Sequence, residues 1–335
     1  MLDVIAIGSA MRDVFLMSRD FKVLKDPKHL DKIGFPEGEA ACFALGAKID
    51  VEAPVFSVGG GAVNAAISFS RLGHRSGACV KIGDDASGKT ILDELKKEKV
   101  KAFATVSKSE ATAYSTLLVT PDGERTALVY RGAGEHVSER DLSLASLRAK
   151  WAYFAPGKMP LPLLERTLVA LKKAGTKVAL NPSRGYLTLH NKKLERVLRA
   201  ADVVLMNREE AAYLTGVPYH KEEKLMKAFF GVFGDGIAVM TEDKKGAVAF
   251  DGAYLYRVGV FKDVKVLDET GAGDAFGAGF VSGLLETGDM LYALRLASAN
   301  AASVVERIGG SEGALTKKRF KHPRWESVPL DIEEL

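Results

Sequence analysis

Short apolar runs alternate with amphipathic stretches along most of the chain, and this alternation restricts the fold more than any other feature. The first apolar run, Val4 to Ile7, ends at Gly8. Similar runs recur at Gly77 to Ile82, Trp151 to Phe154, Lys177 to Leu180, Asp202 to Met206 and Ile237 to Thr241. Apolar residues at helical spacing mark the stretches between them, at Ser87 to Glu98, Leu163 to Ala174, Lys192 to Ala200 and Glu209 to Thr215. The alternation predicts a doubly wound, three-layer αβα fold around a parallel sheet, with a binding crevice at the carboxyl ends of the strands.

Two segments interrupt this alternation. Residues 17–58 hold turn residues and few helical signals, and residues 112–131 alternate apolar and polar side chains around Pro121-Asp122-Gly123, which is typical of a β-hairpin. We expect a small antiparallel β-lid over the crevice, formed by about residues 14–58 and 110–132.

A length of 335 residues corresponds to roughly two average domains. We nevertheless expect one α/β domain over residues 1–335 that carries this lid.

Charge and composition exclude several classes of partner. Lysine plus arginine number 47 against 43 aspartate plus glutamate, a net charge of +4, and the basic residues are scattered, so neither nucleic acid nor a membrane is expected as a partner. No apolar run approaches the ~18 residues that span a bilayer. The chain opens without a basic leader, so we expect a cytoplasmic protein. Cys42 and Cys79 are too few for a disulfide framework and lack metal-site spacing, so any bound cation should have oxygen ligands.

The segment from Gly83 to Thr90 matches the phosphate-loop pattern G-x-x-x-x-G-K-T after a strand. In a true P-loop, backbone N–H groups and Lys89 enclose phosphates, but Asp84 and Asp85 would place two carboxylates in that cradle. The other interpretation is a strand-to-helix turn with an aspartate near the helix N-terminus and Lys89 in solvent. We favour the turn, and a P-loop NTPase remains an alternative function.

Glycines and an acid precede a small-residue helix late in the chain, in Asp268-Glu-Thr270-Gly271-Ala272-Gly273-Asp274. Glycines let several N–H groups converge at a helix N-terminus, where a transferring phosphoryl group can be held. A carboxylate at Asp274 suits a general base that takes a proton from a hydroxyl while the N–H groups stabilise charge on the phosphate. Taken alone, the segment also fits an ordinary helix start with an acid in its first turn.

A second glycine cluster, Gly59-Gly60-Gly61, precedes another helical stretch that contains Asn64. Glycines there let a ligand touch the backbone, and an asparagine offers both a donor and an acceptor, which suits a polyol. Asp13 follows the first strand and can accept two adjacent hydroxyl groups in the same crevice. Seen alone, Asp13 also fits a turn residue and Asn64 a helix cap.

The order of these motifs resembles the ribokinase-like (PfkB) sugar kinase family. An early aspartate, a Gly-Gly helix start, an Asn-x-x-Glu at 207–210 and a late Gly-Ala-Gly-Asp at 271–274 follow one another, and the matching pieces run from Val4 to about Gly310. The segment from Asp268 to Leu285 is the most specific, and Gly59 to Gly73 with 83–88 looks like the family's other signature. The resemblance implies a ribokinase-like α/β fold with a β-lid, and transfer of the γ-phosphoryl group of ATP to a primary hydroxyl of a sugar or nucleoside.

The resemblance also assigns residues. It makes Asp274 the catalytic base, with an anion hole at Gly271, Ala272 and Gly273, and it places sugar-hydroxyl contacts at Asp13, Gly60, Gly61 and Asn64. By the resemblance, Asn207 and Glu210 help to place Mg²⁺ and the ATP phosphates through water, and their spacing of three independently puts both on one face of a helix start. Further nucleotide contacts are implied at Thr241, Gly246 and Asn300, the last of these near adenine. Some members of the family hold a monovalent cation such as K⁺, which here would lie at Asp268, Thr270 and Gly309 of the Gly309-Gly310 loop.

Three departures from the family pattern bear on the substrate. Ala62 replaces a glycine of the sugar motif, Asp243 replaces one in the nucleotide turn, and Ala155-Pro156-Gly157 stands where ribokinases carry a glutamate on the sugar. The last departure argues against a strict ribokinase, and the long segment between Asp13 and Gly59 favours a larger substrate such as a nucleoside. A phosphorylated substrate stays open, because three basic residues fall near the site in the sequence, Arg12, Lys81 and Arg131. Two more hypotheses stay open: a non-catalytic sugar-binding protein on the same fold and, for assembly, a homodimer through the lid.

Overall fold

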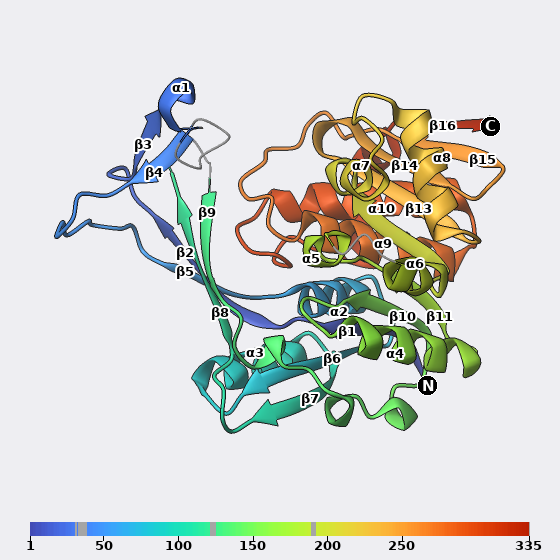
Figure 1. The fold of residues 1–335 in the computed structure, drawn as a ribbon, viewed down its shortest axis with the longest axis horizontal. Coiled ribbons are helices and arrows are strands. Elements are labelled where there is room, and N and C mark those ends of the chain that lie inside the picture. The colour runs from blue at the N-terminus through green and yellow to red at the C-terminus, as the bar shows by residue number, and fades with distance from the viewer. Residues whose placement is uncertain (31, 33–38, 121–124, 189–191, 335) are drawn as a thin grey trace.

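A ten-stranded sheet forms the centre of the molecule in the computed structural model, which describes residues 1–30, 32, 39–120, 125–188 and 192–334 (Figure 1). From one edge to the other its strands are β16 (Leu330–Glu334), β15 (Tyr254–Val258), β14 (Gly246–Phe250), β13 (Ile237–Glu242), β12 (Val203–Asn207), β11 (Lys177–Leu180), β10 (Ala149–Ala155), β1 (Leu2–Gly8), β6 (Ser76–Gly83) and β7 (Lys101–Ser107). The strands from β13 to β7 are parallel, whereas β14, β15 and β16 add an antiparallel edge.

Helices cover both faces of this sheet, as the sequence predicts. One face packs against α2 (Gly61–Arg71), α3 (Ala86–Lys97), α9 (Ala272–Glu286) and α10 (Met290–Val305). The other packs against α4 (Leu161–Lys173), α5 (Arg184–Leu187), α6 (Lys192–Arg199), α7 (Arg208–Thr215) and α8 (Glu222–Phe233). Neighbouring residues of β1 point into opposite layers, with Val4 in one core and Ile5 in the other, so the strands read as continuous apolar runs. The doubly wound three-layer prediction is therefore confirmed.

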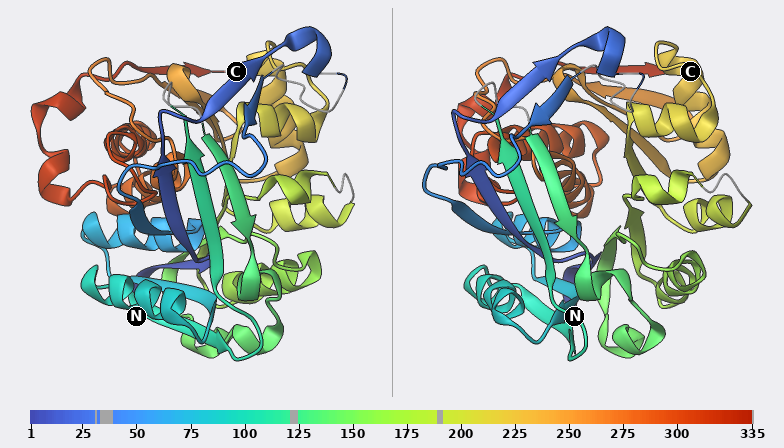
Figure 2. Two further views of the ribbon diagram at one scale, coloured as in Figure 1. Left: turned by 90° about the vertical axis from the view of Figure 1, so that its left-hand side faces the viewer. Right: turned by 60° about the vertical axis from the view of Figure 1, so that its left-hand side comes forward.

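A four-stranded sheet stands beside the main body, and Figure 2 shows its strands side by side. Its order is β5 (Val55–Gly59), β2 (Met11–Met17), β8 (Ala113–Val119) and β9 (Arg125–Tyr130). The two outer pairings are antiparallel, but β2 and β8 run parallel. The expected antiparallel lid is thus a mixed sheet, because short links deliver β2 and β8 from β1 and β7, which already run in one direction. The turn Pro121-Asp122-Gly123 lies outside the described residues, and the flanking strands pair as the predicted hairpin.

The remaining elements are short. A two-stranded sheet joins β3 (Lys22–Lys25) to β4 (Glu39–Cys42) with α1 (Pro27–Leu30) between them, and α11 (Lys317–Phe320) follows α10. Single 3₁₀ turns occupy Gly132–Glu135, Glu139–Asp141, Leu144–Ser146, Asp243–Lys245 and Pro323–Glu326. Within the described ranges no helix is both long and apolar enough to cross a membrane. Cys42 is exposed and Cys79 is buried, and both are free thiols.

Candidate active site

Asp274 and Asn64 meet where the N-termini of α2 and α9 pack together. Asn64 Nδ2 donates to Asp274 Oδ2 over 2.9 Å. Burial raises the pKa of the Asp274 carboxyl, and the hydrogen bond from Asn64 opposes that rise. A Cβ on Gly61 would lie 3.0 Å from Asp274 Oδ1 and 2.5 Å from Ala155 Cβ, so only glycine lets the backbone approach the carboxylate this closely. A carboxyl with a raised pKa next to helix N-termini has the properties of a general base beside an anion site.

The anion-hole residues form the start of α9, directly before this carboxylate. Gly271 is the N-cap, with a φ of 77°, and Ala272 and Gly273 are the first helical residues. The first N–H groups of a helix have no partner within the helix, although Ala272 N donates to the carbonyl of Glu269 over 3.2 Å. The predicted anion hole is therefore adjacent to the predicted base. This adjacency follows from the sequence itself, because the two glycines and the aspartate belong to one local motif.

Asp13 lies on β2 and is only 3% exposed. Burial raises the pKa of its carboxyl to about 7, and the negative charge of Asp268 adds to the rise, whereas Arg12 and a hydrogen bond from Ser115 act in the opposite direction. A Cβ on Gly59 would lie 1.9 Å from Asp13 Oδ2, so the glycine cluster also makes room for this side chain. Gly60 follows directly and Gly61 N donates to Ser9 Oγ over 3.0 Å, so both predicted glycines lie at the junction of β5, α2 and the end of β1.

The predicted cation loop comes together around Asp268, which is 7% exposed. Its Oδ1 accepts from Thr270 N at 3.0 Å and Thr270 Oγ1 at 2.7 Å, and its Oδ2 accepts from Gly309 N at 2.9 Å. Arg125 Nη1 of the small sheet lies 3.3 Å from Asp268 Oδ1, a partner that the sequence did not indicate. Among the described side chains, no three of His, Cys, Asp and Glu converge as a metal site. A monovalent cation held here would therefore need backbone carbonyl oxygens as well as this carboxylate.

Asn207 and Glu210 form a reciprocal capping box at the start of α7. Asn207 Oδ1 accepts from Glu210 N at 2.7 Å, and Glu210 Oε2 accepts from Asn207 N at 3.0 Å. Burial raises the pKa of Glu210, and the bond from Asn207 opposes it. Both side chains stand at the carboxyl end of β12 and offer oxygen atoms, so they fit water-mediated contacts to Mg²⁺.

The predicted nucleotide turn lies next to this box. Thr241 is opposite Asn207 in the register of β12 and β13, and Gly246 begins β14 after a 3₁₀ turn. A pocket of about 290 Å³ opens beside the turn, between residues of β13 to β16 and α8. Glu242, Lys245 and Arg257 are among its lining residues. The sequence did not indicate this pocket, although Gly246 of the predicted nucleotide turn is among the residues that line it.

Asn300 lies inside the core. Its side chain has no exposed surface. Asn300 Nδ2 donates to the carbonyl of Ala275 and its Oδ1 accepts from Leu315 N, each over 2.8 Å. The amide therefore joins α9, α10 and the following segment inside the core, and the predicted position near adenine stays a prediction.

The Gly83 to Thr90 segment is a strand-to-helix turn. Asp85 caps α3, and its carboxylate accepts from Gly88 N at 2.8 Å and from Thr112 N at 2.7 Å. Burial alone would raise the pKa of Asp85, but these bonds hold it below its ordinary value. The carboxylate thus accepts hydrogen bonds from N–H groups that a P-loop would direct at phosphate. The side chain of Lys89 is exposed to solvent. The geometry does not favour the P-loop alternative.

Comparisons with known proteins identify the family and the fold of the chain. The family model described as pfkB family carbohydrate kinase matches residues 1–317. A ribokinase of Haemophilus influenzae is 29% identical, over 78% of this chain and 85% of its own length, and a 5-dehydro-2-deoxygluconokinase of Clostridium perfringens is 28% identical, over 79% and 82%. The structure of an Arabidopsis thaliana ribokinase complexed with ribose and ATP matches with a TM-score of 0.74 at 22% identity, covering 95% of this chain and 97% of that one. The chain belongs to the pfkB family of carbohydrate kinases.

Proposed function

We propose that the protein transfers the γ-phosphoryl group of ATP to a primary hydroxyl of a sugar or nucleoside. The observation that carries this proposal is the contact between Asn64 and Asp274, since it joins the acceptor motif to the phosphoryl motif in one site. Relatives named as ribokinase and as 5-dehydro-2-deoxygluconokinase support a small polyhydroxy acceptor, and a related structure that holds ribose and ATP supports the donor.

In the proposed reaction, Asp274 accepts the proton of the acceptor hydroxyl while the oxygen of that hydroxyl forms a bond to the γ-phosphorus of ATP. The bond between the γ-phosphorus and the leaving oxygen of ADP breaks. The N–H groups of Gly271, Ala272 and Gly273 stabilise the charge that develops on the transferred group. Mg²⁺, when bound, neutralises the phosphate oxygens, and Asn207 and Glu210 would hold it through water. The low-dielectric surroundings that raise the pKa of Asp274 make it a stronger base.

The remaining residues predicted from the sequence extend the same proposal. Thr241 and Gly246 contact the nucleotide, and Asp268, Thr270 and Gly309 hold a monovalent cation such as K⁺. Residues 1–335 form one domain, in which segments 14–58 and 110–132 serve as a lid. A cytoplasmic location and the absence of nucleic acid and membrane partners stay predictions from the sequence.

We also propose a homodimer through the lid. The outer face of the small sheet exposes three large apolar side chains, with 58% of Phe56, 58% of Leu128 and 53% of Tyr130 accessible. Phe56 and Leu128 lie in one cross-strand row of that face. Analytical ultracentrifugation of the wild type and of Leu128→Asp tests the assembly, because a charge in this row would give monomers.

The direct test of the activity is ADP release in the presence of a wide panel of sugars and nucleosides. We expect ATP consumption that depends on one class of acceptor and on Mg²⁺. If no acceptor elicits ADP release while sugars still bind, the non-catalytic sugar-binding alternative replaces this proposal.

A further inference from the structure

A buried arginine at the start of α7 joins three separate segments of the chain. Arg208 is 6% exposed and is the first helical residue after Asn207, the N-cap of α7. Its Nε donates to the carbonyl of Tyr219 over 2.9 Å, and its guanidinium lies over the ring of the same tyrosine. Its Nη1 donates to Glu222 Oε2 over 3.3 Å and also to Glu242 Oε2. One guanidinium therefore ties the first residue of α8 and the last residue of β13 to the start of α7.

Glu242 directly precedes the 3₁₀ turn Asp243–Lys245 in the predicted nucleotide turn. Its Oε1 accepts from Tyr219 Oη at 2.8 Å and from Lys245 Nζ at 2.6 Å, while its Oε2 accepts from Arg208. Burial alone would raise the pKa of Glu242, but the hydrogen bonds from Lys245, Arg208 and Tyr219 lower it to about 2. The carboxylate is therefore ionised at neutral pH and has hydrogen bonds to both of its oxygen atoms.

The turn itself has few means of keeping its position. Residues 243–245 are all exposed, and an exposed turn gains little from packing. At its far end, Gly246 has a φ of 98°, and a Cβ there would lie 2.0 Å from the carbonyl oxygen of Val258, so glycine is required at this point. At its near end, the hydrogen bonds to Glu242 connect the turn to α7 and to Tyr219.

The charges around Arg208 show what its loss would do. Glu222 has a second cationic partner, because its Oε1 accepts from Arg257 Nε over 3.3 Å. Glu242 would keep only Lys245 as a cationic partner, and the side chain of that lysine is 71% exposed, so its attraction is screened by water. Both carboxylates contact the same Nη1 atom, so they would repel each other without it. We therefore expect Glu242 to move toward solvent and to displace the turn when Arg208 is removed.

We propose that Arg208 is a positioning residue that fixes the nucleotide turn through Glu242 and thereby sets the affinity for the nucleotide. This inference rests on the proposed function, because it assigns the turn from Thr241 to Gly246 to ATP. Residue 208 is one of the two unspecified positions of the Asn-x-x-Glu pattern, so the pattern gives it no role. An arginine suits this position because its planar group donates to several acceptors at once, which a lysine does less well.

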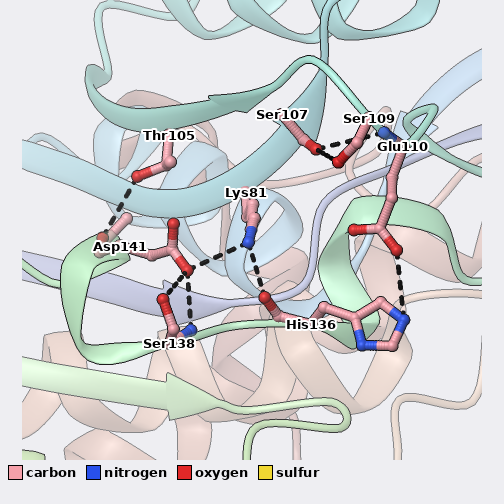
Figure 3. A network of polar contacts seen from close by, with 9 residues as sticks. Lys81, Thr105, Ser107, Ser109, Glu110, His136, Ser138 and Asp141 are labelled. Atoms are coloured by element: carbon pink, nitrogen blue, oxygen red, sulfur yellow. Dashed lines mark hydrogen bonds and ion pairs between the residues drawn. The ribbon is translucent and has the colours of Figure 1, made fainter.

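A second buried ion pair, between Lys81 and Asp141, provides a matched control. Lys81 lies on β6, which β1 separates from the part of the sheet that holds β13. Figure 3 shows that Lys81 Nζ donates to the carbonyl of His136 at 2.6 Å and to Asp141 Oδ2 at 3.1 Å. The side chains of Lys81 and Asp141 are 14% and 8% exposed, and those of Arg208 and Glu242 are 7% and 11% exposed. Removal of either cation thus takes the charge partner from a buried carboxylate, but only Glu242 adjoins the nucleotide turn.

Nucleotide affinity can be measured without turnover by isothermal titration calorimetry of the full-length protein with Mg²⁺ and AMP-PNP, an ATP analogue that is not hydrolysed. We expect Arg208→Met to bind the analogue about tenfold or more weakly than the wild type, because the displaced turn no longer matches the nucleotide. Lys81→Met should bind it as the wild type does, although both variants should have a lower melting temperature. Equal affinity for the analogue in Arg208→Met and Lys81→Met would overturn the inference.

Glu242→Gln tests the other end of the contact and leaves no buried charge without a partner, since Arg208 keeps Glu222. We expect Glu242→Gln to weaken the analogue about threefold or more, and its matched control Asp141→Asn to leave the affinity unchanged. If Arg208 acts through Glu242, the double variant Arg208→Met with Glu242→Gln should bind no more weakly than Arg208→Met alone. Losses that add in the double variant would show that Arg208 acts by another route and would overturn the inference.

Steady-state kinetics separate this inference from the proposed kinase activity. In Arg208→Met the KM for ATP should rise about tenfold, while kcat and the KM for the acceptor should change less than about threefold, as expected when ground-state binding is lost. If AMP-PNP binds the wild type and binds Arg208→Met more weakly, but no sugar or nucleoside elicits ADP release, the inference stands and the kinase activity is removed. If the wild type does not bind AMP-PNP, both are wrong.

Discussion

Asn64 donates a hydrogen bond to Asp274 across a separation of 210 residues in sequence. The contact uses the Nδ2 atom of Asn64 and leaves its buried Oδ1 without a partner in the described structure. One amide therefore orients the carboxylate and leaves a buried acceptor atom unpaired within the described residues, and the contact brings the two glycine-rich helix starts together.

Asp274→Asn should lower kcat by about 10²–10⁴, because the amide cannot take the proton of the acceptor hydroxyl. The substitution conserves shape, so the melting temperature and the KM for ATP should change little. Steady-state kinetics would measure both constants, with the exposed Asp93→Asn as a control that stays near wild type. A loss of less than about tenfold, equivalent to ~1.4 kcal/mol of barrier, would show that Asp274 is not the base.

Asn64→Ala should shift the pH dependence of the reaction. The bond from Asn64 lowers the pKa of Asp274 against the larger effect of burial, so its removal raises that pKa further. The base acts in its ionised form, hence the acidic limb of the pH profile of kcat/KM should move to higher pH. An acidic limb at the wild-type position, in a variant that still folds by circular dichroism, would contradict the assignment of this limb to Asp274.

The sequence predicts most of the main sheet, because buried parallel strands and amphipathic helices have distinct periodicities. The strand expected at Lys177 to Leu180 has those bounds in the structure, and the helix expected at 192–200 ends one residue earlier. The same reasoning does not find β16, since it is a charged edge strand of exposed residues without an apolar run. The direction of β2 relative to β8 is set by the strands that precede them, which no local pattern encodes.

The residues of the candidate site also fall into two groups, those that the sequence predicts and those that it does not. Asp274 and Asn64 are found from sequence because each belongs to a local glycine motif whose chemistry is specific. Ser115 and Arg125 lie outside such motifs, and only strand register and chain packing bring them to Asp13 and Asp268. Asn300 lies in a motif, but the motif does not reveal that both ends of its amide form hydrogen bonds inside the core.

Asp13→Asn should stabilise the ligand-free protein at high pH and weaken acceptor binding. Burial raises the pKa of Asp13 from 3.8 to about 7. Between these values the unfolded chain has lost the proton that the folded protein keeps, so the free energy of unfolding falls as pH rises through this window. The variant lacks that penalty, so its gain should be on the order of a few kcal/mol at pH 8 and should be much smaller at pH 4.

Urea denaturation at both pH values would measure this gain. Asp93→Asn, which removes an exposed carboxyl, should show no comparable difference between the two pH values. A gain from Asp13→Asn that is equal at pH 4 and pH 8 would mean that the Asp13 carboxyl does not carry the shifted pKa.

Lys89→Ala and Asp85→Ala separate a structural turn from a P-loop. Lys89 is exposed, so its removal should leave turnover within about twofold of wild type. Asp85 caps α3 and also accepts from Thr112, so Asp85→Ala should lower the free energy of unfolding by about 1–2 kcal/mol. ADP-release assays and urea denaturation would provide the two readouts. Loss of turnover in Lys89→Ala, with the fold intact, would restore the P-loop alternative.

Glu210→Gln and Glu210→Ala distinguish the capping role of Glu210 from its proposed role at Mg²⁺. A glutamine can still accept from Asn207 N, so Glu210→Gln should keep the capping box and the stability, whereas Glu210→Ala should lose about 0.5–1 kcal/mol. Both variants lack the charge, so both should need about tenfold more Mg²⁺ for half-maximal rate, as expected for a group that acts through bound water. Mg²⁺ titrations would be compared with those of Glu209→Gln, which removes an exposed charge from the same turn. If Glu210→Gln and Glu209→Gln require the same Mg²⁺ concentration, Glu210 only caps the helix and the metal lies elsewhere.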